Sequence, residues 1–239
     1  MSKGYGQYCP VALSTEILGE RWTMLVITAL IDGASRFNDL QRALPRISAT
    51  TLTQRLRTLE DAGVVEKRRT DGGSGFEYVL TEAGRDLEPI IMELAYWGQR
   101  WARDLQPDDR DPRFLGWSMH LRMNVDAMPE GRTVLEFSFS EAPPECRRFW
   151  IIVEDGQTDM CIKPPGYETD LRVSANLARF IDAWRGFRPL RSEIASGRIR
   201  LEGSRKLQRA FPDWLLLSSA AHVDRRRPGR ERTAARRSA

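Results

Sequence analysis

One helix followed directly by a hairpin constrains the fold of this chain more than any other feature. Three leucines recur at helical spacing and form one narrow apolar stripe, which predicts a helix over residues 49–62: Leu52, Leu56 and Leu59. Ser48 is a good N-cap for this helix, and Gly63 is a good residue to follow it. Two short runs rich in Val, Phe and Tyr come next, on either side of a glycine-rich turn over residues 70–75. This pattern predicts a β-hairpin.

The polar face of the predicted helix carries residue types that can read DNA. Thr50, Gln54 and Arg57 lie opposite the leucine stripe, with Thr53 on a flank. Gln can bond adenine and Arg can bond guanine through two hydrogen bonds each, and Thr can reach base edges or phosphates. For an isolated helix, an ordinary solvated face would be the better interpretation. The context favours DNA because the first hairpin strand ends in three consecutive cations: Lys67, Arg68 and Arg69.

The charge of the chain is unevenly distributed. Residues 36–69 hold eight cations against four carboxylates, a local net charge of +4 that suits a surface facing phosphates. Residues 224–239 hold seven arginines against two carboxylates; because the whole chain carries +4, the residues before 224 carry a net charge of −1. This basic tail has no apolar periodicity, so we expect it to be disordered, either touching nucleic acid or simply solvated.

Three further helical segments frame the helix and hairpin. Residues 10–31 predict a helix with an interruption at Gly19, and residues 36–44 predict a short helix that Pro45 ends. Residues 82–105 predict a long helix bent by Pro89, with an apolar face too broad for a helix that covers only a small domain.

Six motifs follow one another in this half of the chain: Cys9-Pro10-Val11, Gly19-Glu20-Arg21-Trp22, Arg36-Phe37-Asn38-Asp39-Leu40, Ser48 to Gly63, Leu80-Thr81-Glu82-Ala83-Gly84 and Trp97-Gly98. From about Tyr8 to Trp101 they resemble the HxlR-type, MarR-related winged-helix regulators. The resemblance implies a homodimer that binds a near-palindromic operator in double-stranded DNA, with the 82–105 helix and the first helix packed across a two-fold axis. Burial of that long helix against the second half of the chain is the alternative. The expected DNA contacts are Arg36, Ser48, Thr50, Thr51, Thr53, Gln54, Arg55, Arg57, Lys67, Arg68 and Arg69.

The hydrophobic period changes after residues 106–112, a polar segment with two prolines that we expect to be a linker. Residues 115–125 alternate between apolar and polar side chains, which predicts a long, half-buried strand. Further strands are expected over residues 133–140, 148–154, 159–163, 169–173 and 198–201, and helices over residues 175–185, 190–195 and 204–215. One antiparallel sheet with helices packed on one face is an α+β arrangement.

Looser motifs mark the second half of the chain: Trp184-Arg185-Gly186, Ile194-Ala195-Ser196-Gly197, Ile199 to Gly203 and Phe211 to Leu215. From about Pro112 to Val223 this half resembles sterol-carrier-protein-like domains. The resemblance implies an apolar cavity between sheet and helices that can hold a hydrophobic small molecule. Seven aromatic residues are candidates to line it, although any single one is more often simply core: Trp117, Phe137, Phe149, Trp150, Trp184, Phe187 and Trp214.

The expected architecture is therefore a two-domain α+β protein. Residues 1–105 form a winged helix-turn-helix domain for DNA binding and dimerisation, and residues 106–112 form the linker. Residues 113–223 form the ligand-binding domain, and residues 224–239 form the disordered basic tail.

Several classes of protein are excluded by what the sequence lacks. It contains no phosphate-binding or nucleophile-elbow motif, so we do not expect an enzyme. Its two histidines and three cysteines are scattered, so we expect neither a metal site, nor a cofactor, nor a disulfide scaffold. The longest apolar runs are shorter than the ~18 residues of a membrane span, and the N-terminus lacks a signal-peptide core. We expect a cytoplasmic protein with no membrane partner.

The function expected from the sequence is that of a bacterial-type transcriptional repressor modulated by a hydrophobic small molecule in its second half. One alternative moves sensing to Cys9, which precedes a helix N-terminus where thiolates are stabilised; the protein would then sense oxidants or electrophiles. A second alternative is a lipid carrier whose first half serves only for dimerisation. The three adjacent cations of the hairpin argue against the carrier, because they have no role in lipid transport.

Overall fold

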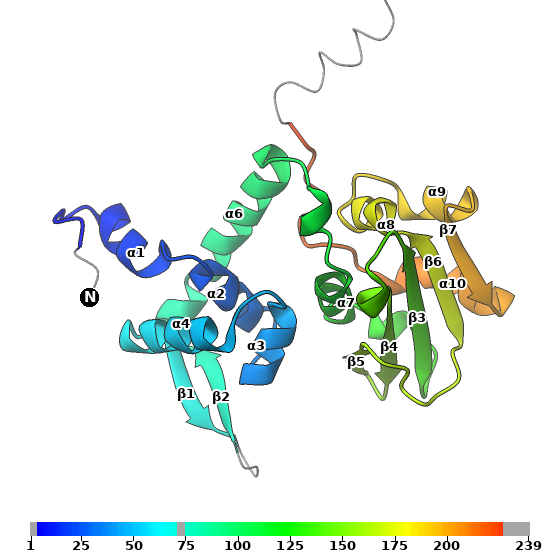
Figure 1. Cartoon of the computed structure of the whole chain (residues 1–239), viewed down its shortest axis with the longest axis horizontal. Helices are drawn as coiled ribbons and strands as arrows, with labels where there is room; N and C mark the ends of the chain where they lie inside the picture. Colours follow the sequence, from blue (N-terminus) through cyan, green and yellow to red (C-terminus); the bar gives the residue numbers. More distant parts are fainter. Residues whose placement is uncertain (1–3, 71–74, 227–239) are drawn as a thin grey trace, which may run out of the picture. The chain divides into compact units, whose positions relative to one another are not determined.

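The computed structural model describes residues 4–70 and 75–226 of the chain (Figure 1). The chain forms two compact units, which divide between Leu94 and Ala95. Residues 71–74 of the expected glycine-rich turn, and the expected tail from residue 227 onwards, lie outside the described residues. No helix in the part of the chain that the structure describes is long and apolar enough to cross a membrane.

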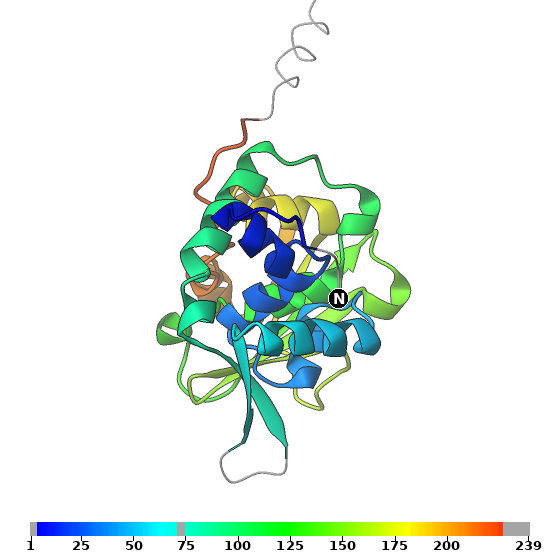
Figure 2. The same cartoon turned by 90° about the vertical axis from the view of Figure 1, so that its left-hand side faces the viewer.

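The N-terminal unit has the element order expected for a winged helix. Four helices precede the hairpin: α1 (Pro10–Leu18), α2 (Thr23–Ile31), α3 (Phe37–Ala43) and α4 (Ala49–Asp61). The hairpin and two more helices follow: β1 (Val65–Arg69), β2 (Phe76–Leu80), α5 (Glu82–Arg85) and α6 (Glu88–Trp101). In Figure 2 the two strands extend away from the helices as a wing. The expected interruption of the first helix at Gly19 is confirmed, and α2 starts after Trp22, whose φ of 79° is left-handed.

The long helix expected over residues 82–105 is broken earlier than predicted. The break follows α5, a single turn whose N-terminus is capped by Thr81: the Thr81 hydroxyl accepts a hydrogen bond from the Gly84 N–H at 3.2 Å. A Cβ at Gly84 would lie 2.3 Å from the Val64 carbonyl oxygen, so only glycine fits there. Pro89 lies in the first turn of α6, where its missing N–H is not needed, and it therefore begins a helix rather than bending one.

The C-terminal unit contains one five-stranded sheet with the strand order β5-β4-β3-β6-β7. The strands are β3 (Thr133–Ser140), β4 (Arg148–Glu154), β5 (Gln157–Cys161), β6 (Leu171–Asn176) and β7 (Ile199–Gly203). The helices of this unit include α7 (Pro112–His120), α8 (Leu177–Trp184), α9 (Leu190–Ala195) and α10 (Arg205–Trp214), with short 3₁₀ turns η1 (Pro107–Asp109), η2 (Val125–Ala127) and η3 (Pro144–Cys146). The expected all-antiparallel sheet is wrong in one pairing, because β6 returns beside β3 and runs parallel to it.

The long strand expected over residues 115–125 is wrong: its first part is the helix α7. The Asp111 carboxylate accepts a hydrogen bond from the Arg113 N–H at 2.9 Å, and Pro112 occupies the first helical turn. Five residues of α7 after its first turn are buried, and they do not lie on one stripe: Leu115, Gly116, Trp117, Met119 and His120. Because the helix is buried on several sides, its apolar positions do not show a helical period and imitate the alternation of a strand.

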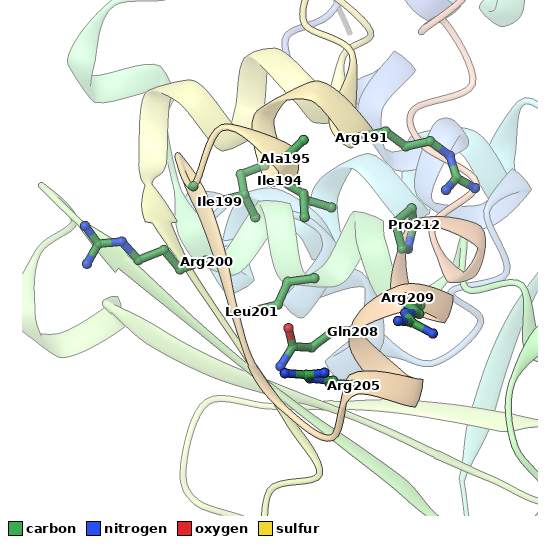
Figure 3. Close-up of a pocket in the computed structure, with 11 residues that line it drawn as sticks. Arg191, Ile194, Ala195, Ile199, Arg200, Leu201, Arg205, Gln208, Arg209 and Pro212 are labelled. Atoms are coloured by element: carbon green, nitrogen blue, oxygen red, sulfur yellow. The ribbon is translucent and has the colours of Figure 1, made fainter.

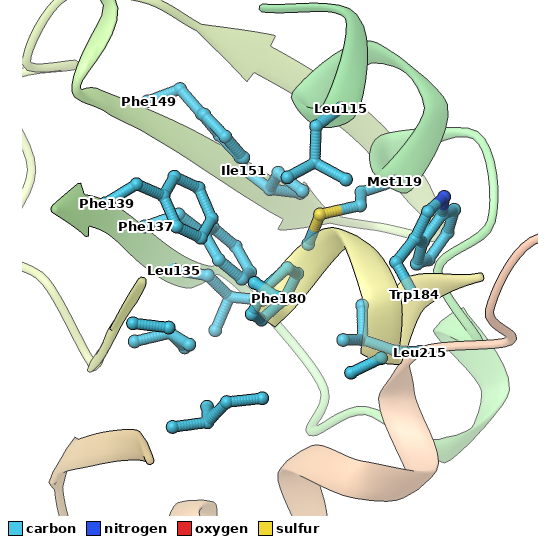
Figure 4. Packing of buried hydrophobic residues seen from close by; sticks show 14 of the residues in the cluster. Leu115, Met119, Leu135, Phe137, Phe139, Phe149, Ile151, Phe180, Trp184 and Leu215 are labelled. Atoms are coloured by element: carbon cyan, nitrogen blue, oxygen red, sulfur yellow. The ribbon is translucent and has the colours of Figure 1, made fainter. Parts of the chain in front are cut away.

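The core of the C-terminal unit is built from aromatic side chains that pack on one face of the sheet. The rings of Phe137 and Phe149 stack with centroids 5.1 Å apart, and Phe139 meets Phe180 of α8 edge to face, also at 5.1 Å (Figure 4). Residues of α7, α8 and α10 join the same cluster. Because side chains alternate along a strand, the residues between these phenylalanines point to the opposite face of the sheet.

The first residues of the expected tail are held by α6. The Arg225 guanidinium donates to the carbonyl oxygens of Gln99 and Ala102 and to the carboxylate of Asp104, and the Arg226 N–H donates to the Arg100 carbonyl. These carbonyls lie at the C-terminal end of α6, where helix carbonyls lack partners and cations are favourable.

Phe137 offers a test of the aromatic core. We expect Phe137→Ala to lower the free energy of unfolding of the C-terminal unit by about 3–5 kcal/mol, because it removes a fully buried ring that contacts Phe149, Phe180 and Phe211. Urea denaturation followed by circular dichroism measures the change. The control is Phe114→Ala on α7, whose side chain is 51% exposed and should change stability by about 0.5 kcal/mol or less. Equal effects of the two variants would contradict the close packing described.

Candidate nucleic-acid interface

Helix α4 is positioned by its N-cap and by its leucine stripe. The Ser48 hydroxyl accepts a hydrogen bond from the Thr51 N–H at 3.1 Å, which caps the helix where the sequence predicts. The three leucines of the stripe are at most 1% exposed. Their burial fixes the rotation of α4 about its axis and with it the set of side chains that face outward.

The outward face of α4 presents four candidates from the sequence: Thr50, Thr53, Gln54 and Arg57 are all exposed. The Thr53 hydroxyl donates to the Ala49 carbonyl at 2.9 Å, within the helix itself. The side chains of Gln54 and Arg57 form no hydrogen bond or ion pair with any residue in 4–70 or 75–226. Both are therefore available to a ligand, as a major-groove reader requires.

The structure separates Arg55 from these candidates. Its guanidinium lies 2.9 Å from the Glu20 carboxylate, and its side chain is only 12% exposed. Glu20 belongs to the turn between α1 and α2. Arg55 therefore ties α4 to that turn, and its role in this structure is to position the helix.

The three consecutive cations of β1 do not lie on one face of the wing. In the hairpin register Lys67 pairs with Tyr78 and Arg69 pairs with Phe76, so these four side chains share a face. The Lys67 ammonium lies 4.4 Å from the centre of the Phe76 ring, a cation–π contact. Lys67 and Arg69 are both exposed.

Arg68 points to the opposite face of the hairpin, where carboxylates compensate its charge. Its guanidinium lies 2.7 Å from the Glu66 carboxylate, and its partner in the register is Glu77. The hydrogen bond between Arg68 and Glu66 raises the pKa of the guanidinium and lowers the pKa of the carboxyl. A count of charges along the sequence treats the three cations as equal, whereas the strand period makes Arg68 the weakest candidate for phosphate contact.

Arg36 lies beside the wing although it is distant in sequence. It is the exposed N-cap residue of α3, and the carbonyl of its neighbour Ser35 accepts a hydrogen bond from the Tyr78 N–H at 2.7 Å. This bond places Arg36 beside the edge of β2, the second strand of the wing. Helix α4 and the wing thus present two sets of available donors, one on the helix and one on the hairpin.

The seven aromatic candidates for a ligand cavity are mostly core. Phe137, Phe149, Trp184 and Trp214 belong to the aromatic cluster, and Trp117 and Trp150 are buried as well. Phe187 is half-buried, with the Arg185 guanidinium 4.7 Å from its ring. Trp150 neighbours Phe149 on β4, so the two side chains lie on opposite faces of the sheet and cannot line one cavity. A hydrophobic ligand stays a prediction.

A hollow of about 580 Å³ lies between α9, β7 and α10 (Figure 3). Its apolar part includes Ile194, Leu201 and Pro212, and its polar part includes arginines: Arg191, Arg200, Arg205 and Arg209. In Figure 3 the Arg200 side chain points away from Leu201, as expected for consecutive residues of a strand.

Cys9 lies where the sequence places it, at the N-cap of α1, and it is exposed. Hydrogen bonds from the backbone N–H groups of Ala12 and Val11 lower the pKa of its thiol. Cys146 contrasts with it, because burial raises the pKa of the Cys146 thiol.

Known proteins similar to this chain match its N-terminal half. The HxlR-like helix-turn-helix family matches residues 17–106. The uncharacterized HTH-type transcriptional regulator YdeP of Bacillus subtilis is 38% identical over 94 residues, which cover 39% of this chain and 73% of YdeP. YvaP, another uncharacterized HTH-type regulator of B. subtilis, is 34% identical over 111 residues, covering 46% of this chain and 95% of YvaP. The redox regulator HypR, solved in its reduced form, is 37% identical over 38% of this chain and 91% of HypR, with a TM-score of 0.36.

YdeP and YvaP are aligned over most of their own lengths. The segment that the family matches, residues 17–106, includes α4 and the wing. The chain belongs to the HxlR-like helix-turn-helix family of transcriptional regulators.

Proposed function

We propose that this protein is a sequence-specific repressor that binds a near-palindromic operator as a homodimer. The observation that carries the proposal is the pair of available side chains on α4, Gln54 and Arg57, beside a wing that presents Lys67 and Arg69. Glutamine and arginine side chains on a helix can read base edges, and exposed cations on a wing can hold the phosphate backbone. Selection of bound fragments from random DNA tests the proposal, and the symmetry of the selected sites reports the dimer.

An exposed apolar stripe on α6 supports the homodimer. Ile90, Leu94, Trp97 and Trp101 recur at helical spacing, and each is between 37% and 58% exposed. A stripe of this kind is unfavourable in water and is typical of an interface. A two-fold axis would pair it with its copy, so that one surface serves both chains.

The opposite side of α6 packs within the C-terminal unit. The buried Gln99 donates to the Arg185 carbonyl at 2.8 Å and accepts from the Arg185 guanidinium at 2.8 Å. At helical spacing Gln99 lies across the helix from Trp97. Only the face of α6 that carries Gln99 is therefore buried within the C-terminal unit. The apolar stripe on the opposite face stays available to a second copy of the chain.

A hydrophobic effector in the C-terminal unit is the regulatory part of this proposal. The aromatic core is filled by its own side chains, so the hollow between α9, β7 and α10 is the better location for an apolar ligand. An effector of this kind must bind the DNA-competent state and the other state with different affinities, since equal affinity would shift nothing.

A second candidate mode of regulation is thiol sensing through Cys9. It is favoured by the exposure of this thiol and by its lowered pKa, since the thiolate is the species that reacts with oxidants and electrophiles. A lipid carrier without DNA binding has less support, because it assigns no role to the available donors of α4 and the wing.

The DNA contacts give a graded prediction. Gln54→Ala should reduce the discrimination between operator and random DNA by about 1–3 kcal/mol, the value of one bidentate base contact. Lys67→Gln and Arg69→Gln should weaken the binding of operator and random DNA alike. Each should also lower the slope of the logarithm of the binding constant against the logarithm of the salt concentration by about one. Arg68→Gln is the matched control: it removes the same charge, but Glu66 already compensates it, so the loss should be smaller. Fluorescence anisotropy at several salt concentrations measures all four variants.

If Gln54→Ala, Lys67→Gln and Arg69→Gln all bound operator and random DNA as the native protein does, α4 and the wing would not be the DNA-binding surface.

The stripe on α6 predicts the oligomeric state. Light scattering at micromolar concentration should give about twice the chain mass of 27.4 kDa, and Trp97→Glu should shift the protein toward monomer because it places a charge in the interface. Glu88→Lys, on the opposite face of α6, is the control and should leave the mass unchanged. A native protein that is monomeric with and without DNA would rule out the dimer.

Cys9 should be the most reactive of the three thiols. Its lowered pKa leaves more thiolate at neutral pH than an ordinary cysteine has, so its alkylation rate should fall only once the pH drops below that lowered pKa. Cys146 should react more slowly, because its raised pKa and burial keep it a thiol. Mass spectrometry after timed iodoacetamide treatment measures each site.

For sensing, peroxide should release DNA from the native protein and not from Cys9→Ser; the same response in both proteins would exclude Cys9 as the sensor.

A further inference from the structure

The outer face of the C-terminal sheet carries a polar hollow of about 690 Å³, separate from the aromatic core. It is lined by Ser138, Ser140, Arg147, Ser174, Ala175, Asn176, Arg179, Gly197, Arg198 and Arg200. No aspartate or glutamate is among these lining residues.

The floor of the hollow is made of hydroxyl groups on two central strands. Phe137 and Phe139 of β3 point into the core, so Ser138 and Ser140 between and after them point to the outer face. Ser174 of β6 is the direct neighbour of Ser138 in the parallel pairing of the two strands. Each hydroxyl can donate one hydrogen bond to an oxygen of a ligand.

Four arginines from three parts of the unit converge on this floor. Arg147 precedes β4, and Arg179 lies on α8. Arg198 directly precedes β7, and Arg200 is the second residue of that strand. The buried Glu193 carboxylate lies 2.9 Å from the Arg179 guanidinium and 3.9 Å from that of Arg198, so it neutralises one charge and fixes two of the side chains.

The other two cations have no compensating carboxylate. Arg147 donates only a long hydrogen bond of 3.5 Å to the Ala142 carbonyl, and Arg200 forms no hydrogen bond or ion pair within residues 4–70 and 75–226. The hollow therefore retains a strong positive charge after its internal ion pairs are counted. Uncompensated arginines gathered in a concave site are unfavourable unless an anion binds between them.

The start of α8 adds to this field. Asn176 caps α8 by accepting a hydrogen bond from the Arg179 N–H at 3.0 Å, and both residues line the hollow. The N-terminus of a helix carries a partial positive charge that favours anions nearby.

We propose that this hollow binds a small organic polyanion, a molecule with a phosphate group or several carboxylates. Guanidinium groups bind the oxygens of such groups through paired, charge-assisted hydrogen bonds, and serine hydroxyls complete the coordination. The volume lies in the range of small-molecule sites, which is about 300–1,000 Å³. An apolar ligand does not suit this lining. Gly197 and Arg200 line this hollow and also the hollow between α9, β7 and α10, but the serines belong to this one alone, and the apolar residues Ile194, Leu201 and Pro212 belong to the other.

A DNA phosphate is the other anion that this protein would meet. A duplex would touch the arginines, whereas the serine hydroxyls of two central strands add donors that suit a compact anion. The hydroxyl floor therefore favours a small molecule, and DNA contact is one of the outcomes that the experiment separates.

Calorimetric titration of the full chain without DNA tests the proposal, with sodium pyrophosphate and sodium citrate as probes at constant ionic strength. We expect saturable binding of at least one probe with one site per chain. Arg147→Gln and Arg200→Gln should each weaken binding about tenfold or more, the loss expected for a charged hydrogen bond. Arg205→Gln is the matched control: it removes the same charge from the neighbouring hollow and should leave the affinity unchanged. Thermal unfolding of each variant without probe verifies that it is folded.

Three results would overturn the proposal. The first is the absence of saturable binding of both probes. The second is an equal loss of affinity in Arg205→Gln and Arg200→Gln, since that would be non-specific attraction to net charge. The third is a tenfold loss of DNA affinity in Arg147→Gln and Arg200→Gln with unchanged pyrophosphate and citrate binding, which would make the hollow a DNA contact. Because the titration contains no DNA, failure of the proposed repressor function would leave its result unaffected.

Discussion

Burial of the α4 leucines determines what the N-terminal unit can do. Leu52, Leu56 and Leu59 are removed from water, and burying three such side chains is worth roughly 5–9 kcal/mol before the cost of ordering them. Rotating α4 would expose this stripe, so the rotation is fixed. The exposure of Gln54 and Arg57 follows from that constraint and needs no further interaction. Arg55 lies on the flank of the helix, between the leucine stripe and the exposed face. The same rotation of α4 turns its side chain toward Glu20.

The same logic applies to the sheet of the C-terminal unit, with a period of two instead of 3.6. Because Phe137 and Phe139 fill the core, Ser138 and Ser140 have to face the other way. The parallel pairing of β3 with β6 then brings Ser174 beside Ser138. One strand register thus builds both the aromatic core and the hydroxyl floor of the basic hollow. Packing that stabilises the core thus also determines where the polar groups of the proposed anion site lie.

Local signals in the sequence predict much of this structure. The expected bounds of β3, β4 and α9 are those observed, because each of these elements is an apolar segment bounded by turn residues. The hydrophobic period led to a wrong prediction over residues 115–125, because a helix that is buried on several sides has no polar face and so no helical pattern of polar residues. It also could not give the parallel pairing of β3 with β6, which depends on contacts between residues distant in the chain. For a related reason the sequence does not distinguish Arg55 and Arg68 from the other cations: composition shows a cation but does not show the carboxylate folded against it.

Helix α6 is the element through which regulation of the proposed kind would have to act. Its apolar stripe faces away from Gln99, and Gln99 is bonded to Arg185, whose pKa is lowered by burial and by the nearby Arg225. Arg225 in turn bonds the carbonyls at the end of α6. Both arginines are half-buried, so their repulsion is only partly screened, and the Asp104 carboxylate, 3.0 Å from Arg225, offsets part of it. A ligand that altered the packing around Arg185 would therefore change the support of α6 on one face while the other face holds the proposed dimer together. By this route a ligand could shift the equilibrium between two states of the packing around Arg185 only by the difference between its binding free energies for those states.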